Sequence, residues 1–308
     1  MKASKIKAEE FMDENPFTVD GDSSIASVRD SMEERNLRAV AVERDGQLEG
    51  AVSYRDLIRH VQFNPDTTKL EKIVHNPPNF EPEDTVLELC DLRINSGKKL
   101  LTCTDPDENL EAVFSDEEFR KALQKVDEVQ KISSRDVASF EVVKAFESDS
   151  VEKVRHQMLD NNISRIPVLD EDGKLVGVLR STDVLKLLVP REGQSSGGTS
   201  GNSLKDTQIA GGNEKERLSS INVSEVMNRT PTTSQKHISG EKALELMDDR
   251  DSHEVLIVDD KYPEAVVTGK DFIKHVAELK ASDTVLVNLV GLDVDEEKAA
   301  VHEKIETQ

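Results

Sequence analysis

Hydroxyl and carboxylate side chains recur three residues apart at points where an apolar segment gives way to an amphipathic one. Ser53 precedes Asp56 in this way, and Thr268 precedes Asp271. If a helix begins at each point, its free N–H groups and positive dipole end suit a phosphate. The carboxylate can accept hydrogen bonds from both hydroxyls of a ribose. The pattern therefore predicts a site for a ligand with a sugar and an anionic group, although an ordinary helix cap uses the same residue types.

Two further junctions carry altered versions of this pattern. Asp183 keeps the carboxylate, but Arg180 takes the hydroxyl position and is followed by a Ser–Thr pair. Arg180 either contacts a phosphate directly or fills the cleft. At the remaining junction, Phe114 and Glu117 stand in the two positions. We expect that last site to be empty or structural.

The four junctions belong to four repeats of about sixty residues, a period typical of repeat architectures. The interval from the start of the preceding predicted helix to the acidic residue is 31 positions in three repeats and 32 in the other. Seven residues into that helix stand Met32, Arg93, Met158 and Met247. The four intervals are Ile25–Asp56, Val86–Glu117, Val151–Asp183 and Gly240–Asp271.

Each repeat predicts the same β-α-β-β-α order. A short extended segment precedes a helix with apolar residues at three- and four-residue steps, as in "SVEKVRHQMLDNN". Ser24 and Ser150 stand at N-cap positions, and Asn36 and Asn162 stand where a helix end favours left-handed geometry. Two apolar strands follow, joined by an acidic turn such as "DEDG", and a second amphipathic helix closes the unit.

A unit of this size buries little surface alone, so we expect the repeats to pair into an α/β (α+β) fold. The predicted domains are a first module with repeats one and two (1–125), a second module with repeats three and four (126–280) and a C-terminal strand–helix extension (281–308). Within the second module, the Gly/Ser-rich stretch at about 191–220 is predicted to be a flexible insert.

The chain resembles the cystathionine-β-synthase (CBS) domain family from about Glu9 to Leu279. The resemblance is clearest in "NNISRIPVLDEDGKLVGVLRSTDVLKLL" of repeat three and weakest in repeat two. It implies that the repeats pair into two Bateman modules. It also implies clefts for an adenosine compound, namely AMP, ADP, ATP or S-adenosylmethionine. The family uses a Thr in the early extended segment, where Thr18 and Thr233 lie.

Composition excludes several functional classes. The net charge is −22, from 62 acidic and 40 basic residues, which disfavours free DNA or RNA as a partner. No apolar run is long enough for a membrane span, and no signal peptide is visible, so we expect a cytoplasmic protein. The chain lacks the GxxxxGK[ST], HExxH and GxSxG motifs. We therefore expect no catalytic activity, no metal site and no required cofactor.

Positive charge is expected near the clefts, where it suits an anionic ligand or simply forms a solvated surface. The two cysteines show no metal or redox spacing and are expected to be buried, and the seven histidines are expected at surface or capping positions. The basic residues concerned are Arg38, Arg55, Lys99, Arg165, Lys270 and Lys274.

Two functions are compatible with the sequence. The first is a regulatory sensor that binds an adenine nucleotide and signals to a partner. The second depends on the segment after residue 281, which weakly resembles the opening of ribosome hibernation-promoting factors. That segment either docks on the repeats or on a second copy, or begins a larger domain. In the second function the repeats are a scaffold for a homo-oligomeric, ribosome-associated stress factor.

Overall fold

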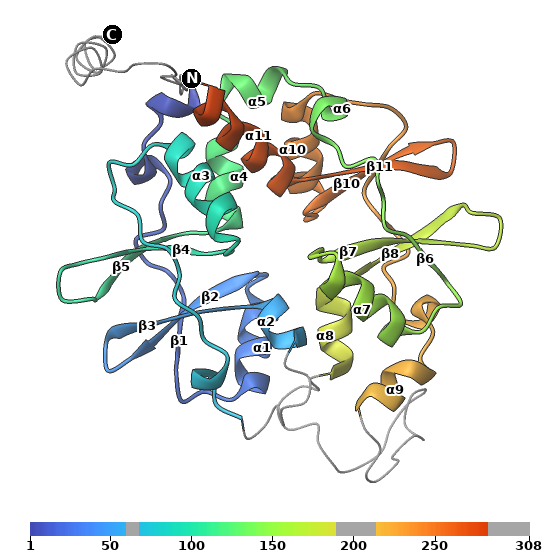
Figure 1. Cartoon of the computed structure of the whole chain (residues 1–308), viewed down its shortest axis with the longest axis horizontal. Helices are drawn as coiled ribbons and strands as arrows, with labels where there is room; N and C mark the ends of the chain where they lie inside the picture. Colours follow the sequence, from blue (N-terminus) through green and yellow to red (C-terminus); the bar gives the residue numbers. More distant parts are fainter. Residues whose placement is uncertain (60–67, 189–213, 283–308) are drawn as a thin grey trace, which may run out of the picture.

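Four lobes surround a common centre in the computed structural model, which describes residues 1–59, 68–188 and 214–282 (Figure 1). Each lobe is one repeat, and the predicted α/β class with four repeats is confirmed. Residues 283–308, which include nearly all of the predicted C-terminal extension, lie outside the described residues. So does most of the predicted insert, but its end at Glu214–Ser220 forms helix α9 rather than a loop.

Local sequence explains the ends of the elements. The Ser24 side chain caps the first helix by accepting a hydrogen bond from the Ser27 N–H, and Ser150 caps the corresponding helix of repeat three. Asn36 and Asn162 both have a φ of 53°, the left-handed conformation expected beyond a helix end. These predicted caps and helix ends are confirmed.

Repeats one and two form the first module. In repeat one the first strand pairs in parallel with the second, which pairs antiparallel with the third. Repeat two has only the antiparallel pair, and a single bridge between Asn79 and Thr102 takes the place of its first strand. The elements are β1 (Thr18–Asp20), α1 (Ile25–Glu34), β2 (Ala39–Arg44), β3 (Gln47–Ser53), α2 (Tyr54–Arg59), α3 (Val86–Ser96), β4 (Leu101–Thr104), β5 (Leu110–Phe114) and α4 (Asp116–Leu123).

Repeats three and four form the second module, and both have the three-stranded sheet seen in repeat one. Short helices α5 (Asp127–Lys131) and α6 (Ser134–Val137) join the modules. The elements of the two repeats are β6 (Ala145–Phe146), α7 (Val151–Asp160), β7 (Arg165–Leu169), β8 (Leu175–Arg180), α8 (Ser181–Leu188), β9 (Thr233–Ser234), α10 (Gly240–Asp249), β10 (Glu254–Asp259), β11 (Tyr262–Thr268) and α11 (Gly269–Ser282).

Within each module the sheets of the two repeats meet. In the first module a small apolar cluster joins Ala39 and Ala51 of repeat one to Leu100 and Val113 of repeat two. In the second module the Leu175 N–H donates to the Lys261 carbonyl at 2.8 Å, so hairpin ends of repeats three and four are hydrogen-bonded. These contacts between sheets therefore pair repeat one with repeat two and repeat three with repeat four, as predicted for two modules.

The two large cores lie between the modules rather than within them. One core contains Met32 and Ile58 of repeat one together with Met158 and Leu185 of repeat three. The other joins helices of repeat two to helices of repeat four, with α3 packed along α11 (Figure 1). Separating the modules would expose the apolar helix faces of both cores to water. The free-energy cost would be roughly proportional to the apolar area exposed. The four repeats consequently form one body.

Both cysteines, Cys90 and Cys103, are free and buried, as predicted. Burial raises the pKa of the Cys103 thiol to about 11, so this thiol is not ionised near neutral pH. Among the described helices, none combines the length and the apolar character needed to cross a bilayer.

Gly240, the first residue of α10, offers a test of the packing between repeat four and α5. A Cβ at this position would collide with the backbone carbonyl of Val129, whereas a Cβ on Gly269 would meet nothing within 4 Å. Gly240→Ala should lower the free energy of unfolding by about 1–3 kcal/mol, the usual cost of overpacking. Gly269→Ala, the matched control, should be neutral or slightly stabilising. Urea unfolding measures both, and equal effects would contradict the packing described.

Candidate ligand cavity between the modules

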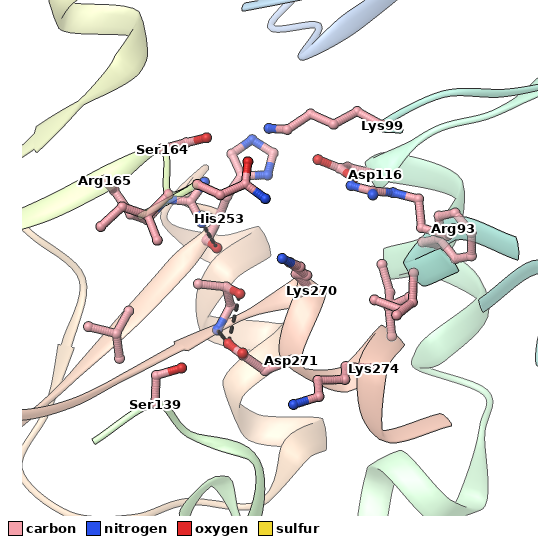
Figure 2. A pocket seen from close by; sticks show the side chains of 18 of the residues that line it. Arg93, Lys99, Asp116, Ser139, Ser164, Arg165, His253, Lys270, Asp271 and Lys274 are labelled. Carbon is pink, nitrogen blue, oxygen red and sulfur yellow. Dashed lines mark hydrogen bonds and ion pairs between the residues drawn. The ribbon is translucent and has the colours of Figure 1, made fainter. Parts of the chain in front are cut away.

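A cavity of about 450 Å³ opens at the centre of the four repeats, a volume within the range of about 300–1,000 Å³ typical of small-molecule sites. All four repeats contribute to its lining: Arg55 comes from repeat one, Asp116 from repeat two, Ser164 from repeat three and Asp271 from repeat four. Figure 2 shows Asp116, Ser164 and Asp271, which come from different repeats, around one space. We call this space the large cavity.

The hydroxyl–carboxylate pair of repeat four lies in the large cavity. The Thr268 N–H and Oγ1 both donate to Asp271 Oδ2, each at 2.7 Å (Figure 2). Burial raises the pKa of Asp271, and the two bonds from Thr268 oppose this effect. Because both bonds end on Oδ2, the other oxygen, Oδ1, is available to accept from a ligand hydroxyl.

An apolar wall lies beside this pair. It is built by the extended segment before β6, which is held against β11 by two backbone hydrogen bonds between Ser139 and Val266 at 3.0 and 3.1 Å. A flat aromatic group can lie against such a wall, since burying apolar surface is favourable. The apolar residues of this part of the lining are Val142, Val143, Ile163, Pro167 and Val266.

Basic side chains line another part of the large cavity. Five of the six basic residues selected from the sequence line the large cavity. Burial lowers the pKa of Lys270, and the neighbouring Arg55 and Arg93 add to this effect. Arg93, Arg120, Arg165 and Lys274 have carboxylate partners. A group of like charges in a partly buried space still favours a further anion nearby. The five residues are Arg55, Lys99, Arg165, Lys270 and Lys274, and Arg93 and Arg120 join them.

Arg180 does not line the large cavity, and a buried carboxylate holds its guanidinium group. Its Nη2 lies 2.7 Å from Glu254 Oε1, and Arg165 Nε lies 3.1 Å from Glu254 Oε2. Only 1% of the Glu254 side chain is exposed. Asp183 accepts a hydrogen bond from the Arg180 backbone N–H at 2.9 Å. Both roles considered for Arg180, contact with a phosphate and filling of the cleft, stay predictions.

Asp56 and Ser53 make the same local contacts as the pair of repeat four, with Ser53 N and Oγ donating to Asp56 Oδ2 at 2.9 and 2.6 Å. However, His75 Nδ1 also lies 3.3 Å from that oxygen. Burial by itself would raise the pKa of Asp56, but the hydrogen bonds from His75 and Ser53 outweigh it and lower the pKa to about 2. Asp56 does not line the large cavity.

The two threonines taken from the family pattern lie at the starts of strands. Thr18 begins β1 and pairs with Ala41, and Thr233 begins β9 and pairs with Leu256. Neither residue lines the large cavity. Of the eight predicted ligand-binding residues, the structure thus brings together Thr268 and Asp271 in this cavity, and their role as ligand contacts stays a prediction.

Repeat two departs from the expected alignment by one residue. Its helix α4 begins one position later after the strand than in the other repeats, with Ser115 as the N-cap. Ser115 N and Oγ donate to Glu118 Oε2 at 2.9 and 2.6 Å, so Glu118, and not Glu117, makes the contacts of Asp56. Phe114 is fully buried against the rings of Phe80 and Phe119. The assignment of Glu117 was therefore wrong, because the strand ends on a core residue.

The sequence analysis did not select Arg93, Asp116, Arg120 or His253, all of which line the large cavity. Arg93 Nη2 lies 3.2 Å from Asp116 Oδ1. The one sequence signal for Arg93 was that it stands where the other three repeats have a methionine. His253 faces the same space (Figure 2). The expectation of surface or capping histidines was wrong for His75, His237 and His253, which have buried ring nitrogens. Within the described residues no group of three or more His, Cys, Asp or Glu could hold a metal ion.

A family model described as "CBS domain" matches residues 8–62, 134–190 and 223–278, which are repeats one, three and four and make up more than half of the chain. The uncharacterized protein MJ1404 of Methanocaldococcus jannaschii is 28% identical over 92% of this chain and 65% of its own length. The uncharacterized protein MJ1225 of the same organism is 28% identical over 52% of this chain and 51% of its own length. The chain thus spans less than two thirds of either relative.

Two solved structures have the same fold. The crystal structure of MJ1225 superposes with a TM-score of 0.69 at 18% identity, over 88% of this chain and 99% of that one. An uncharacterized conserved protein from Pyrococcus horikoshii superposes with a TM-score of 0.59 at 16% identity, over 88% and 100%. At these identities the likeness concerns the fold alone.

The lowered pKa of Asp56 predicts a defined pH dependence of stability. A carboxyl with a folded pKa of about 2 and an ordinary value of 3.8 contributes about 2 kcal/mol at neutral pH, and this contribution is lost as the pH falls from about 4 to 2. Asp56→Asn should therefore be less stable than the wild type at pH 7, and the difference should shrink in acid. Thermal unfolding between pH 2 and 7 measures it.

Asp183 supplies the matched control, because burial raises its pKa instead. Its ionisation costs stability, so the stability of Asp183→Asn relative to the wild type should rise, and not fall, as the pH increases above about 4. Parallel pH profiles for the two variants would contradict the contacts assigned to Asp56.

Proposed function

The chain belongs to the CBS domain family, and from this premise we propose that it is a regulatory protein without catalytic activity that binds an adenine nucleotide in the large cavity. One observation carries the proposal: the Thr268–Asp271 pair, an apolar wall and a group of basic side chains line the same space. These three surfaces match the sugar, base and phosphate of a nucleotide. The relatives are uncharacterized proteins, so the proposal depends on the site.

The fit of a nucleotide follows from the chemistry of each surface. Asp271 accepts from the ribose hydroxyls, and the N-terminus of α11 adds its positive dipole end to the neighbouring Lys270. The base lies along the extended segment at Val142 and Val143. Phosphate oxygens are then directed towards Lys270 and Arg165. Stacking of an adenine on aliphatic side chains needs no aromatic residue, which agrees with the low aromatic content of 4%.

The candidate ligands differ in charge. AMP, ADP and ATP carry phosphates that the basic wall attracts. S-adenosylmethionine carries a positively charged sulfur, which the same wall repels. We therefore expect the phosphorylated ligands to bind more tightly than S-adenosylmethionine.

A ligand in the large cavity contacts both modules at once. Arg55 and Arg93 come from the first module, and Lys270 and Asp271 come from the second. Binding consequently favours arrangements of the two modules that keep these groups around the ligand, and a partner that senses the arrangement senses the ligand. This is the proposed sensing mechanism.

The second function, a ribosome-associated hibernation or dimerisation factor, depended on the C-terminal extension, and residues 283–308 lie outside the described residues. No observation on the described residues favours it over the sensor. The ribosomal partner, the homo-oligomer and the cytoplasmic location all stay predictions.

Titration calorimetry with AMP, ADP, ATP and S-adenosylmethionine tests the sensor. Asp271→Ala removes a charged acceptor whose hydrogen bonds are worth about 1.5–3 kcal/mol, so the affinity should fall roughly 10- to 150-fold. The matched control is Glu88→Ala. Thr85 N and Oγ1 donate to Glu88 at 2.8 and 2.7 Å, the same contacts as at Asp271, but Glu88 does not line the cavity.

Glu88→Ala should therefore bind nucleotide like the wild type while losing a comparable helix cap. The proposed function fails if none of the four compounds binds the wild type, or if Asp271→Ala and Glu88→Ala bind equally well.

A further inference from the structure

Three aromatic side chains are exposed at the outer end of the second module. Phe146 and Tyr262 are each 48% exposed, and Phe140 is 46% exposed. Among the described residues, the only other large apolar side chain with comparable exposure is Met1. The whole chain has two Tyr and nine Phe, so a sizeable share of its rings lies in water here. Such exposure is unfavourable unless another surface covers the rings.

The other three repeats have polar residues at the same positions. Phe140 follows the residue that bridges to the last strand of the paired repeat, and Phe146 lies four residues before the N-cap of the first helix. Tyr262 lies nine residues before the carboxylate at the start of the second helix. Because all four repeats share one fold, the fold itself does not require a ring at any of these positions. The equivalent residues are Glu14, Asn76 and Arg229; Asp20, Glu81 and Gln235; and Gln47, Asn109 and Lys174.

Two of the rings flank the turn between β7 and β8. On one side, Phe146 in β6 pairs with Leu169, the last residue of β7. On the other side, a Cβ on Gly173 in the turn would lie 3.9 Å from the ring of Tyr262. The hairpin ends of repeats three and four are hydrogen-bonded at this point (Figure 1). The two rings therefore come from different repeats but lie at the same end of the module.

Phe140 lies at this end as well, because its segment is hydrogen-bonded to β11. The centroid of its ring is 5.8 Å from that of His237. His237 Nε2 in turn lies 3.8 Å from Oε1 of Glu264, which is two residues beyond Tyr262. We call the exposed surface of Phe140, Phe146 and Tyr262 the rim patch.

Negative charge borders the rim patch. The turns at 170–174 and 259–261 contain five acidic residues and two lysines, a net charge of −3. One of these lysines, Lys174, is already paired with Asp172. The corresponding turns of the first module, 44–46 and 105–108, contain four acidic residues and one arginine, again −3, but no aromatic residue. The first module therefore provides an internal comparison with the same charge and no rings.

The combination of rings and acidic turns restricts the kind of partner. Two copies of the chain docked rim to rim would bring their acidic turns together, and like charges across an interface are unfavourable. DNA or RNA would be repelled for the same reason. A Lys or Arg side chain, however, is attracted both by the acidic turns and by the face of an aromatic ring. The chain already contains one such contact, since Arg35 Cζ lies 4.1 Å from the centroid of the Phe17 ring.

We propose that the rim patch docks a segment of a partner protein that carries both basic and apolar side chains. The apolar side chains cover the rings, and the Lys or Arg side chains lie between the rings and the acidic turns. An aromatic side chain buries about 150–250 Å² when enclosed, so three half-exposed rings offer roughly 200–350 Å². An interface of this size is small, so docking is weak and reversible. As the partner of the proposed sensor this segment rests on the proposed function, but docking itself needs no nucleotide.

A labelled peptide tests the proposal on the full chain. The probe is a fluorescein-labelled helical peptide of Lys and Leu, about 16 residues long, with its leucines on one face. Fluorescence anisotropy without nucleotide should show binding. The triple variant Phe140→Ser, Phe146→Ser, Tyr262→Ser should weaken it at least about 10-fold, because aromatic residues dominate small interfaces. A peptide with Glu in place of Lys should not bind.

Matched controls come from the first module. Gln47→Ser changes the position equivalent to Tyr262 and should leave the affinity within about 2-fold of the wild type. Asp259→Asn, opposite Tyr262 in the hairpin, should weaken binding. Asp107→Asn, which removes an equally exposed charge from a turn of repeat two, should not. Urea unfolding verifies that each variant folds, as expected for substitutions at exposed positions.

The proposal is overturned if the basic peptide does not bind, or if the triple variant binds it as tightly as the wild type. Equal effects of Asp259→Asn and Asp107→Asn would also overturn it, since the peptide would then follow only the net charge of the chain. Sedimentation equilibrium addresses the remaining occupant. A wild-type dimer that the triple variant abolishes would show that a second copy covers the rim patch. Because no nucleotide is present in these experiments, their failure is separate from a failure of the proposed function.

Discussion

The packing of helices between the two modules is the constraint on which the rest of the structure depends. Each large core is shared by one repeat of the first module and one repeat of the second. This arrangement closes the four repeats around a centre (Figure 1). It also fixes which residues face that centre, namely those at the ends of the first helices and the starts of the second helices. A repeat in isolation would have neither the core nor the cavity.

The charge at the centre follows from this closure. Equivalent positions of different repeats come together, so basic side chains that are far apart in the sequence become neighbours although the whole chain carries a net charge of −22. Glu254 offsets Arg165 and Arg180, and Asp116 offsets Arg93. Arg120 and Lys274 are paired with Asp248 and Glu278. Burial lowers the pKa values of Arg55, Lys99 and Lys270. That an anionic ligand binds among these cations stays a prediction.

Sequence patterns predicted the features that local interactions determine. The repeat order, the caps at Ser24 and Ser150, and the left-handed Asn36 and Asn162 all depend on residues close in the chain. The same is true of the bonds between Thr268 and Asp271. Among the basic residues that line the large cavity, Arg55, Lys270 and Lys274 follow the strand-to-helix junctions, whereas Lys99 lies just before β4 and Arg165 begins β7.

Features set by long-range packing were not predictable in the same way. Helix α4 begins one residue later than the equivalent helices because Phe114, at the end of β5, is buried in the core. Glu118 therefore makes the hydrogen bonds that Asp56 and Asp271 make in their repeats. The partner of Arg180 is Glu254, which is 74 residues away and in another repeat. His75 reaches Asp56 through backbone pairing with Ala51, and no spacing rule indicates that contact. Each of the three lies within a single module and depends on how its strands and buried side chains pack in the folded chain.

A crystal structure grown with ADP tests the central claim most directly. The account predicts ADP in the large cavity, with its ribose hydroxyls within hydrogen-bond distance of the Asp271 carboxylate and its phosphates among Lys270, Arg165 and Lys99. ADP bound at another place on the chain, with Asp271 free of any ligand contact, would contradict it.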